Sequence, residues 1–130
     1  MSVDEFFERY EYKYDPKGRD EWRVLVEDSD GKYRGDCEDA SLSVLYYVIC
    51  KESWLKFWWL LITFQAKLCY VVTRTGEGHA VLRYGDMYID NWTKKWVTKS
   101  GMEKVGHEFH PWKFIPTTVA IKMVMAKLRG

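Results

Sequence analysis

Cys37, His79 and Asp90 are the side chains of this sequence whose types could together perform nucleophilic catalysis. In such a group a thiolate attacks a carbonyl carbon, an imidazole takes the thiol proton, and a carboxylate orients the imidazole. The sequence therefore predicts Cys37 as the nucleophile and His79 as the base that later protonates the leaving group. Asp90 is predicted to orient His79. This chemistry requires no cofactor.

The residues around Cys37 place the thiol at the start of a helix. Gly35 and Asp36 are typical of a turn followed by a helix N-cap, and apolar residues at helical spacing follow Cys37. Unpaired N–H groups and a partial positive charge at a helix start lower the pKa of a thiol. The same N–H groups could stabilise the oxyanion of a tetrahedral intermediate.

Two strand-like segments, residues 79–84 and 87–92, carry the other two candidate catalytic residues. Gly85 and Asp86 separate them and favour a two-residue hairpin turn. In that register His79 and Asp90 share one face of the hairpin, on a diagonal of about 7–8 Å between strand positions. A three-residue loop would place them on opposite faces, so the prediction depends on the register.

The same predicted face carries three further side chains that could bind substrate. Trp92 lies opposite His79 in this register, where its ring could shield the site or line a cleft. Arg83 and Tyr88 pair across the hairpin and could contact substrate. We therefore predict a substrate-binding role for Trp92, Arg83 and Tyr88.

Three short segments resemble a known family. They are Gly35-Asp-Cys-Glu-Asp-Ala, Gly78-His-Ala-Val-Leu and Tyr88-Ile-Asp-Asn. In this order and spacing they resemble the bacterial transglutaminase-like cysteine proteinase family over roughly residues 20–92. The resemblance implies an α+β fold with a papain-like/transglutaminase-like core, in which the nucleophile helix packs on an antiparallel β-sheet. It also implies thiol endopeptidase activity on a protein or peptide substrate.

By the same resemblance, Asp36, Glu38 and Asp39 match acidic positions that bear on calcium binding. Carboxylates crowded around Cys37 should raise the pKa of its thiol, and a bound cation would remove that conflict. Oxygen ligands suit calcium. Alternatively, Asp36 caps the helix while Glu38 and Asp39 complement the dipole of its first turn.

The predicted acyl-enzyme leaves other functions open. Transfer of the acyl group to an amine would make the protein a transglutaminase, and attack on a glutamine side chain would make it a deamidase. A protein that kept the fold without catalysis would be a protein-binding module. The sequence does not distinguish these alternatives, and it does not determine the oligomeric state.

Length and composition limit the remaining possibilities. The 130 residues fit one domain, residues 1–130, and 47% of them are apolar, so a dense core is expected. A net charge of +1 gives no overall field that favours nucleic acid. The apolar stretch 54–64 is shorter than the roughly 20 residues that span a bilayer, so no membrane association is expected.

Cysteine usage and the N-terminal residues predict a cytoplasmic location. An odd number of cysteines, three, cannot all pair, and the first residues lack the apolar segment of a signal peptide. The chain is also shorter than typical members of the family that it resembles. A compact protein of this kind is consistent with a viral protein that acts in the host cytoplasm.

Periodicity predicts the other elements. We expect helices over residues 3–14 and 53–66, strands over 68–74 and 96–99, and irregular structure over 101–116. Residues 22–26 could be a strand or a helical turn. For residues 117–125 we favour a strand in the first half, with a helix as the alternative.

Several side chains that could carry chemistry are better explained by packing. Cys50 and Cys69 fall in apolar stretches and are expected in the core. The tryptophans at 54, 58 and 59 are expected to pack against the sheet. His107 and His110 have a spacing that could hold zinc, but no partner cysteine pair accompanies them.

Overall fold

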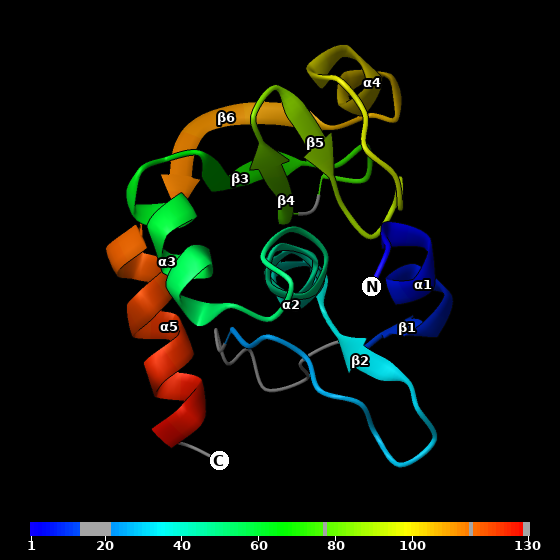
Figure 1. The fold of residues 1–130 in the computed structure, drawn as a ribbon. Helices are drawn as coiled ribbons and strands as arrows, with labels where there is room; N and C mark the ends of the chain where they lie inside the picture. The colour runs from blue at the N-terminus through cyan, green and yellow to red at the C-terminus, as the bar shows by residue number, and fades with distance from the viewer. Residues whose placement is uncertain (14–21, 77, 115, 129–130) are drawn as a thin grey trace.

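A computed structural model describes residues 1–13, 22–76, 78–114 and 116–128. Its elements follow the order α1 (Val3–Arg9), β1 (Tyr10–Tyr12), β2 (Tyr33–Gly35), α2 (Cys37–Ser43), a π-helical segment η1 (Val44–Ile49), α3 (Trp54–Ile62), β3 (Ala66–Val72), β4 (Gly78–Tyr84), β5 (Met87–Ile89), α4 (Lys99–Lys104), β6 (Glu108–Phe114) and α5 (Pro116–Leu128). Strands β5-β4-β3-β6 form an antiparallel sheet, and β1 pairs with β2 in parallel. The predicted α+β architecture, with the helix of Cys37 against an antiparallel sheet, is confirmed (Figure 1).

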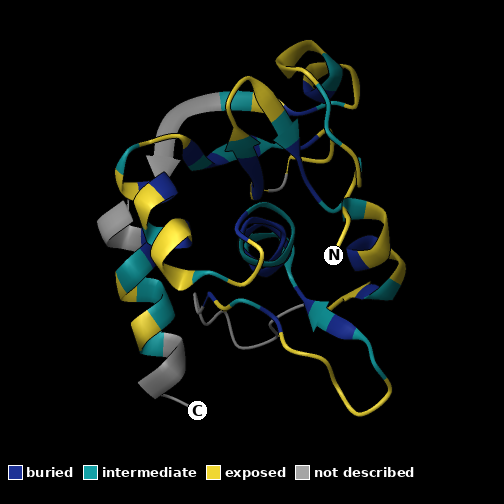
Figure 2. Ribbon diagram, in the orientation of Figure 1, coloured by how far each residue is buried: buried dark blue, intermediate teal, exposed yellow. Residues whose placement is uncertain are grey.

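Helix α2 lies at the centre of the molecule, and residues 39–43 are all buried although three of them are polar (Figures 1 and 2). Its buried residues include Ala40 and Leu42, and η1 continues the buried run with Leu45. The helix begins at Cys37 because Asp36 and Asp39 form a reciprocal cap. Asp39 N donates to Asp36 Oδ1 at 3.2 Å, and Asp36 N donates to Asp39 Oδ2 at 3.4 Å.

The sheet is covered on both faces. Alternation along β4 sends Ala80 and Leu82 into the large core that contains α2. Val81 points to the opposite face, where it packs in a smaller cluster with Met102 of α4. Strand β4, which packs against α2, is therefore held between two apolar layers.

The β4–β5 hairpin has the predicted register. Tyr84 pairs with Met87 and Arg83 with Tyr88, so the turn consists of Gly85 and Asp86. The second strand, however, ends at Ile89 rather than at residue 92. It ends there because the chain turns: the N–H groups of residues 92 and 93 donate to the side chain of Asp90, and that of residue 94 donates to its carbonyl.

Other boundaries differ from the predictions made from periodicity. The first helix ends at Arg9, and the following residues form β1, while part of the predicted range, residues 14–21, lies outside the described residues. The predicted strand 96–99 is reduced to a bridge between Val97 and Tyr88. The stretch predicted as irregular contains α4 and β6, and the strand favoured for 117–125 is wrong, because helix α5 covers it. Residues 22–26 form neither predicted element.

The core predictions were correct for the cysteines and only partly correct for the tryptophans. Cys50 and Cys69 are buried. Helix α3 instead buries Phe57, Leu60 and Leu61, and leaves Trp54 and Trp59 45% and 61% exposed. The prediction fails because the helix buries one stripe, and these two tryptophans lie beside it.

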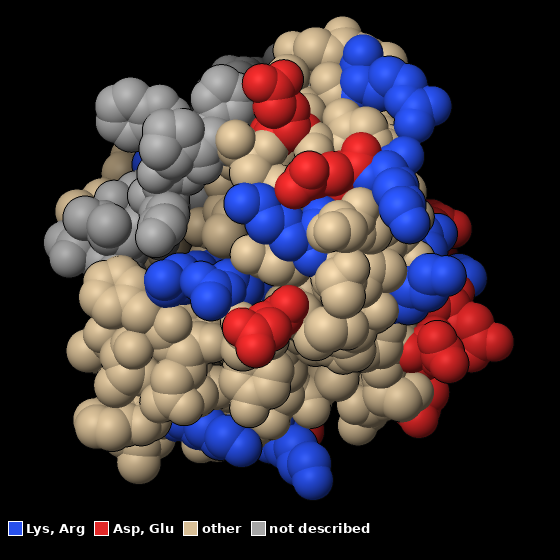
Figure 3. All heavy atoms as spheres, turned by 90° about the horizontal axis from the view of Figure 1, so that it is seen from above, with Lys and Arg blue, Asp and Glu red and all other residues tan. Residues whose placement is uncertain are grey.

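No helix among the described residues has the length and apolarity needed to cross a membrane. The face seen from above carries acidic and basic side chains next to one another (Figure 3). No single sign of charge dominates that face, so it offers no uniform field for a charged ligand.

Two buried serines of α2 give a matched test of this packing. Ser43 Oγ accepts from Leu25 N at 2.8 Å and donates to Asp39 O at 2.6 Å, whereas the buried Ser41 Oγ has no hydrogen-bond partner in the part of the chain that the structure describes. We expect Ser43→Ala to lower the free energy of unfolding by about 1–3 kcal/mol, because it leaves Leu25 N–H unpaired. Ser41→Ala should change it by less than about 0.5 kcal/mol. If urea denaturation shows equal losses in the free energy of unfolding for the two variants, the hydrogen bonds assigned to Ser43 are wrong.

Candidate active site

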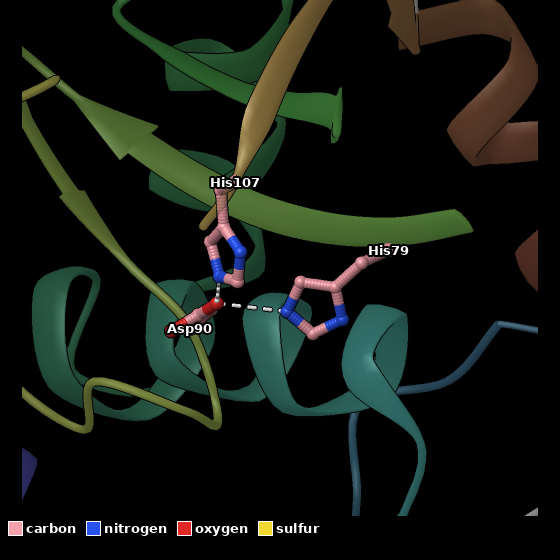
Figure 4. A group of neighbouring side chains, drawn as sticks. All are labelled: His79, Asp90 and His107. Carbon is pink, nitrogen blue, oxygen red and sulfur yellow. Dashed lines mark hydrogen bonds and ion pairs between the residues drawn. The ribbon is translucent and has the colours of Figure 1, made fainter. Parts of the chain in front are cut away.

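Asp90 and His79 are joined directly in the structure. His79 Nε2 lies 2.8 Å from Asp90 Oδ2, and both side chains are buried (Figure 4). β4 carries His79, and the turn after β5 carries Asp90. The side chains of His79 and Asp90 therefore meet across the gap between the two strands, as the predicted register requires.

The thiol of Cys37 lies beside this pair. Ala80 N donates to Cys37 Sγ at 3.4 Å, so the first residue of α2 contacts the backbone directly after His79. His79 uses Nε2 for Asp90, and its Nδ1 points away from that carboxylate (Figure 4). The structure thus brings the three predicted catalytic residues into one site at the junction of α2 and the sheet.

His107 is a site residue that the sequence did not identify as one. Its Nε2 lies 2.6 Å from Asp90 Oδ2, and its side chain is fully buried. The only signal in the sequence was its spacing from His110, which suggested zinc, and the His110 side chain lies outside the described residues. Pairing of β6 with β3 brings His107, which directly precedes β6, to the site.

Hydrogen bonds keep the carboxylate of Asp90 charged. Burial alone would raise its pKa, but the bonds from His107 and His79 outweigh burial and hold the pKa well below its usual range. The second oxygen, Oδ1, accepts from the backbone N–H groups of Trp92 and Thr93 at 3.1 and 2.8 Å. Both oxygens of Asp90 are therefore fully engaged.

The surroundings of the thiol oppose its ionisation. Burial strongly raises the pKa of Cys37, and the charge of Glu38 raises it further. The thiol also donates a hydrogen bond to Glu38 Oε2 at 3.2 Å. The bond from Ala80 N acts in the opposite direction, because it stabilises the thiolate. Burial and the charge of Glu38 therefore both disfavour the thiolate of Cys37.

The three acidic residues around Cys37 differ in their contacts. Burial and the charge of Asp36 raise the pKa of Glu38 to about 7, so these two carboxyl groups interact closely. Asp39 points into the fold, where it also accepts from Arg23 N at 2.9 Å, and burial raises its pKa to about 8. Carboxylates suit calcium, but Asp39 accepts two backbone N–H groups and Asp36 accepts one, from Asp39, whereas Glu38 accepts from the thiol of Cys37.

The three predicted substrate-binding residues lie in different surroundings. The Trp92 ring is 46% exposed, with its centroid 5.6 Å from that of His79. Tyr88 packs edge-on against Phe109 at 5.1 Å, in the smaller apolar cluster. Arg83 Nε donates to Gly85 O at 2.8 Å in the hairpin turn. Of the three, Trp92 covers the candidate site.

Among the described residues, His79, Asp90 and His107 form a group whose ligand atoms lie within 4.8 Å of one another. Nitrogen and carboxylate ligands of this kind suit zinc. However, two ligands around a tetrahedral zinc ion lie about 3.3 Å apart, whereas the two imidazole nitrogens here approach Asp90 Oδ2 at 2.8 and 2.6 Å. The geometry is that of hydrogen bonds.

The nucleophile helix packed on this antiparallel sheet defines a papain-like fold of the transglutaminase-like type. Searches against models of protein families and against curated protein sequences give no match. Solved structures with the same fold include three of LapG from Legionella pneumophila.

EGTA-treated LapG superposes with a TM-score of 0.55 at 22% identity, covering 81% of this chain and 57% of LapG. A second LapG structure superposes with a TM-score of 0.55 at 22% identity, covering 81% of this chain and 59% of LapG. Calcium-bound LapG superposes with a TM-score of 0.52 at 19% identity, covering 81% of this chain and 59% of LapG. The chain spans less than two thirds of LapG, and the likeness supports the family resemblance seen in the sequence.

Glu38→Gln tests the electrostatics of the thiol. A carboxyl group whose pKa rises on folding stabilises the fold fully below its unfolded pKa and loses that contribution as pH rises through its folded pKa. For Glu38 this window runs from about 4.5 to about 7. We expect Glu38→Gln to melt several degrees above the wild type at pH 8.

The gain in melting temperature for Glu38→Gln should vanish near pH 4. Glu8→Gln, at an exposed position of α1, serves as the control and should melt like the wild type at both pH values. A gain that persists undiminished at pH 4 would show that the charge of Glu38 is not its cause.

Proposed function

We propose that this protein is a cysteine hydrolase that cleaves peptide or amide bonds through Cys37, His79 and Asp90. The observation that carries the proposal is the hydrogen bond between His79 and the buried carboxylate of Asp90, with Cys37 at the adjacent start of α2. Such a relay of carboxylate, imidazole and thiol suits acyl transfer. The shared fold with LapG is consistent with it.

The residues divide the reaction between them. His79 Nδ1 takes the proton of Cys37, and the thiolate attacks the substrate carbonyl. Asp90 stabilises the imidazolium that forms, because Oδ2 accepts the hydrogen bond from Nε2–H. The first N–H groups of α2 would stabilise the oxyanion of the intermediate. His79 then protonates the leaving group, and water resolves the acyl-enzyme.

Calcium is part of the proposal because of the charge around the thiol. Asp36 and Glu38 would hold the ion, whose positive charge would offset the carboxylates that raise the pKa of Cys37. Asp39 would join only by giving up its bonds to Arg23 N and Asp36 N. LapG has been solved in calcium-bound and EGTA-treated forms, which is consistent with this assignment.

A cleavage assay tests the proposed reaction. We expect the wild type to cut members of a peptide library and Cys37→Ala to lose this activity by at least about 10³-fold, since the nucleophile is absent. Cys69→Ala, which changes a buried cysteine of β3, should retain it. Release of ammonia without chain cleavage would reassign the protein to deamidation or transamidation.

Thiol labelling provides the matching measurement without a substrate. In the presence of calcium ions, iodoacetamide should modify Cys37 faster than it modifies an ordinary exposed thiol at neutral pH. A rate no faster than that of an ordinary thiol, with full biological effect retained by Cys37→Ala, would instead indicate a binding module.

Calcium binding is tested by thermal denaturation. We expect calcium to raise the melting temperature of the wild type, because binding to the folded state alone stabilises it. Asp36→Asn should abolish most of this rise, while Asp86→Asn, which changes an exposed acid in the hairpin turn, should not. If calcium raises the melting temperature of Asp36→Asn as much as that of the wild type, the ion binds at another place.

A further inference from the structure

His107 has a buried imidazole that plays no role in the reaction described above. It lies in the link between α4 and β6, is 2% exposed, and bonds to Asp90 Oδ2 at 2.6 Å. Its ring centroid lies 5.1 Å from that of His79 and 4.9 Å from that of Trp92. The two histidines therefore share one carboxylate oxygen (Figure 4), and the ring of Trp92 packs against both of them.

The surroundings of His107 determine where its proton lies. Its Nδ1 is buried and has no hydrogen-bond partner among the described residues. A proton on Nδ1 would leave a buried donor unpaired, whereas a proton on Nε2 is donated to Asp90. These contacts favour the tautomer of His107 that donates through Nε2. In that tautomer His107 donates to Asp90 without adding a positive charge that would compete with an imidazolium at His79.

We propose that His107 is a positioning residue, whose Nε2–H fixes the carboxylate of Asp90 so that Oδ2 keeps the imidazole of His79 aligned with Cys37. This inference rests on the proposed function, because it assigns a task within the same reaction. Two observations support it independently of pKa: the short contact to the oxygen that His79 uses, and the burial of all three side chains.

The charge state of Asp90 follows from the same contacts. Burial favours its neutral form, and the bonds from His107 and His79 reverse that preference. The titratable groups that face Asp90 are His79 of β4 and His107 itself. Cys37 and Glu38 of α2 lie on the side of His79, and Lys99 and Glu103 of α4 line a hollow beside His107. Loss of the His107 bond should therefore move the protonation of Asp90 to higher pH.

Two substitutions separate positioning from packing. His107→Phe retains a buried ring beneath Trp92 and removes the donor, whereas His107→Gln retains an N–H near the position of Nε2. In His107→Phe we expect the ¹³C NMR titration of the Asp90 carboxyl to move up by about 1 pH unit or more. We also expect iodoacetamide to modify Cys37 about tenfold more slowly at pH 7 with calcium present. His107→Gln should restore both quantities most of the way to wild type.

The outcomes separate this inference from the proposed function. If wild-type Cys37 reacts no faster than an ordinary thiol, the proposed function fails, and the Asp90 titration still reports whether His107 acts on that carboxylate. If wild-type Cys37 is reactive and His107→Phe matches the wild type in both measurements, His107 is a packing residue. Equal impairment of the Phe and Gln variants would also overturn the inference.

The wild type supplies a test that does not depend on a variant folding. Imidazole ¹⁵N spectra should show His107 protonated at Nε2 and unprotonated at Nδ1 at neutral pH. A proton at Nδ1 of His107 would overturn the inference, because the ring could then reach Asp90 only as an acceptor or as a competing cation.

Discussion

The carboxylate of Asp90 is buried and accepts hydrogen bonds at both oxygens from separate parts of the chain. Oδ1 accepts from the backbone of its own turn, and Oδ2 accepts from His79 and His107. A charge this deeply buried is stable only when such donors surround it. The end of β5, the start of β4 and the link before β6 must therefore all be in place before the site exists, which ties its assembly to closure of the whole sheet.

The helix that presents Cys37 carries a conflict between stability and reactivity. Its cap needs Asp36 and Asp39, and the cap sets the start of the helix at the thiol. The same carboxylates, with Glu38, surround a group that would have to become an anion. The calcium-bound LapG structure shares this fold, and a cation beside Asp36 and Glu38 would reconcile the two demands. Strain of this kind between folding and function is typical of catalytic sites.

The likeness to LapG at 22% identity is a likeness of fold, and it extends over 81% of this chain. Trp92 packs against both His79 and His107 with a ring that is 46% exposed, so this ring lies between the two imidazoles and solvent. The exposed tryptophans of α3 lie on a different element of the fold.

The sequence by itself determined the start of α2 at Cys37, the two-residue turn of the hairpin and the nearness of His79 to Asp90, because capping, turn chemistry and strand alternation act over a few residues. The tertiary structure alone decided the end of β5, the strand β6, the helix α5 and the arrival of His107 at Asp90. Pairing of β6 with β3 joins segments about forty residues apart, and local periodicity carries no information about such a contact. The contact between His79 and Asp90 could thus be predicted from neighbours in the chain, whereas the contact between His107 and Asp90 could be found only in the tertiary structure.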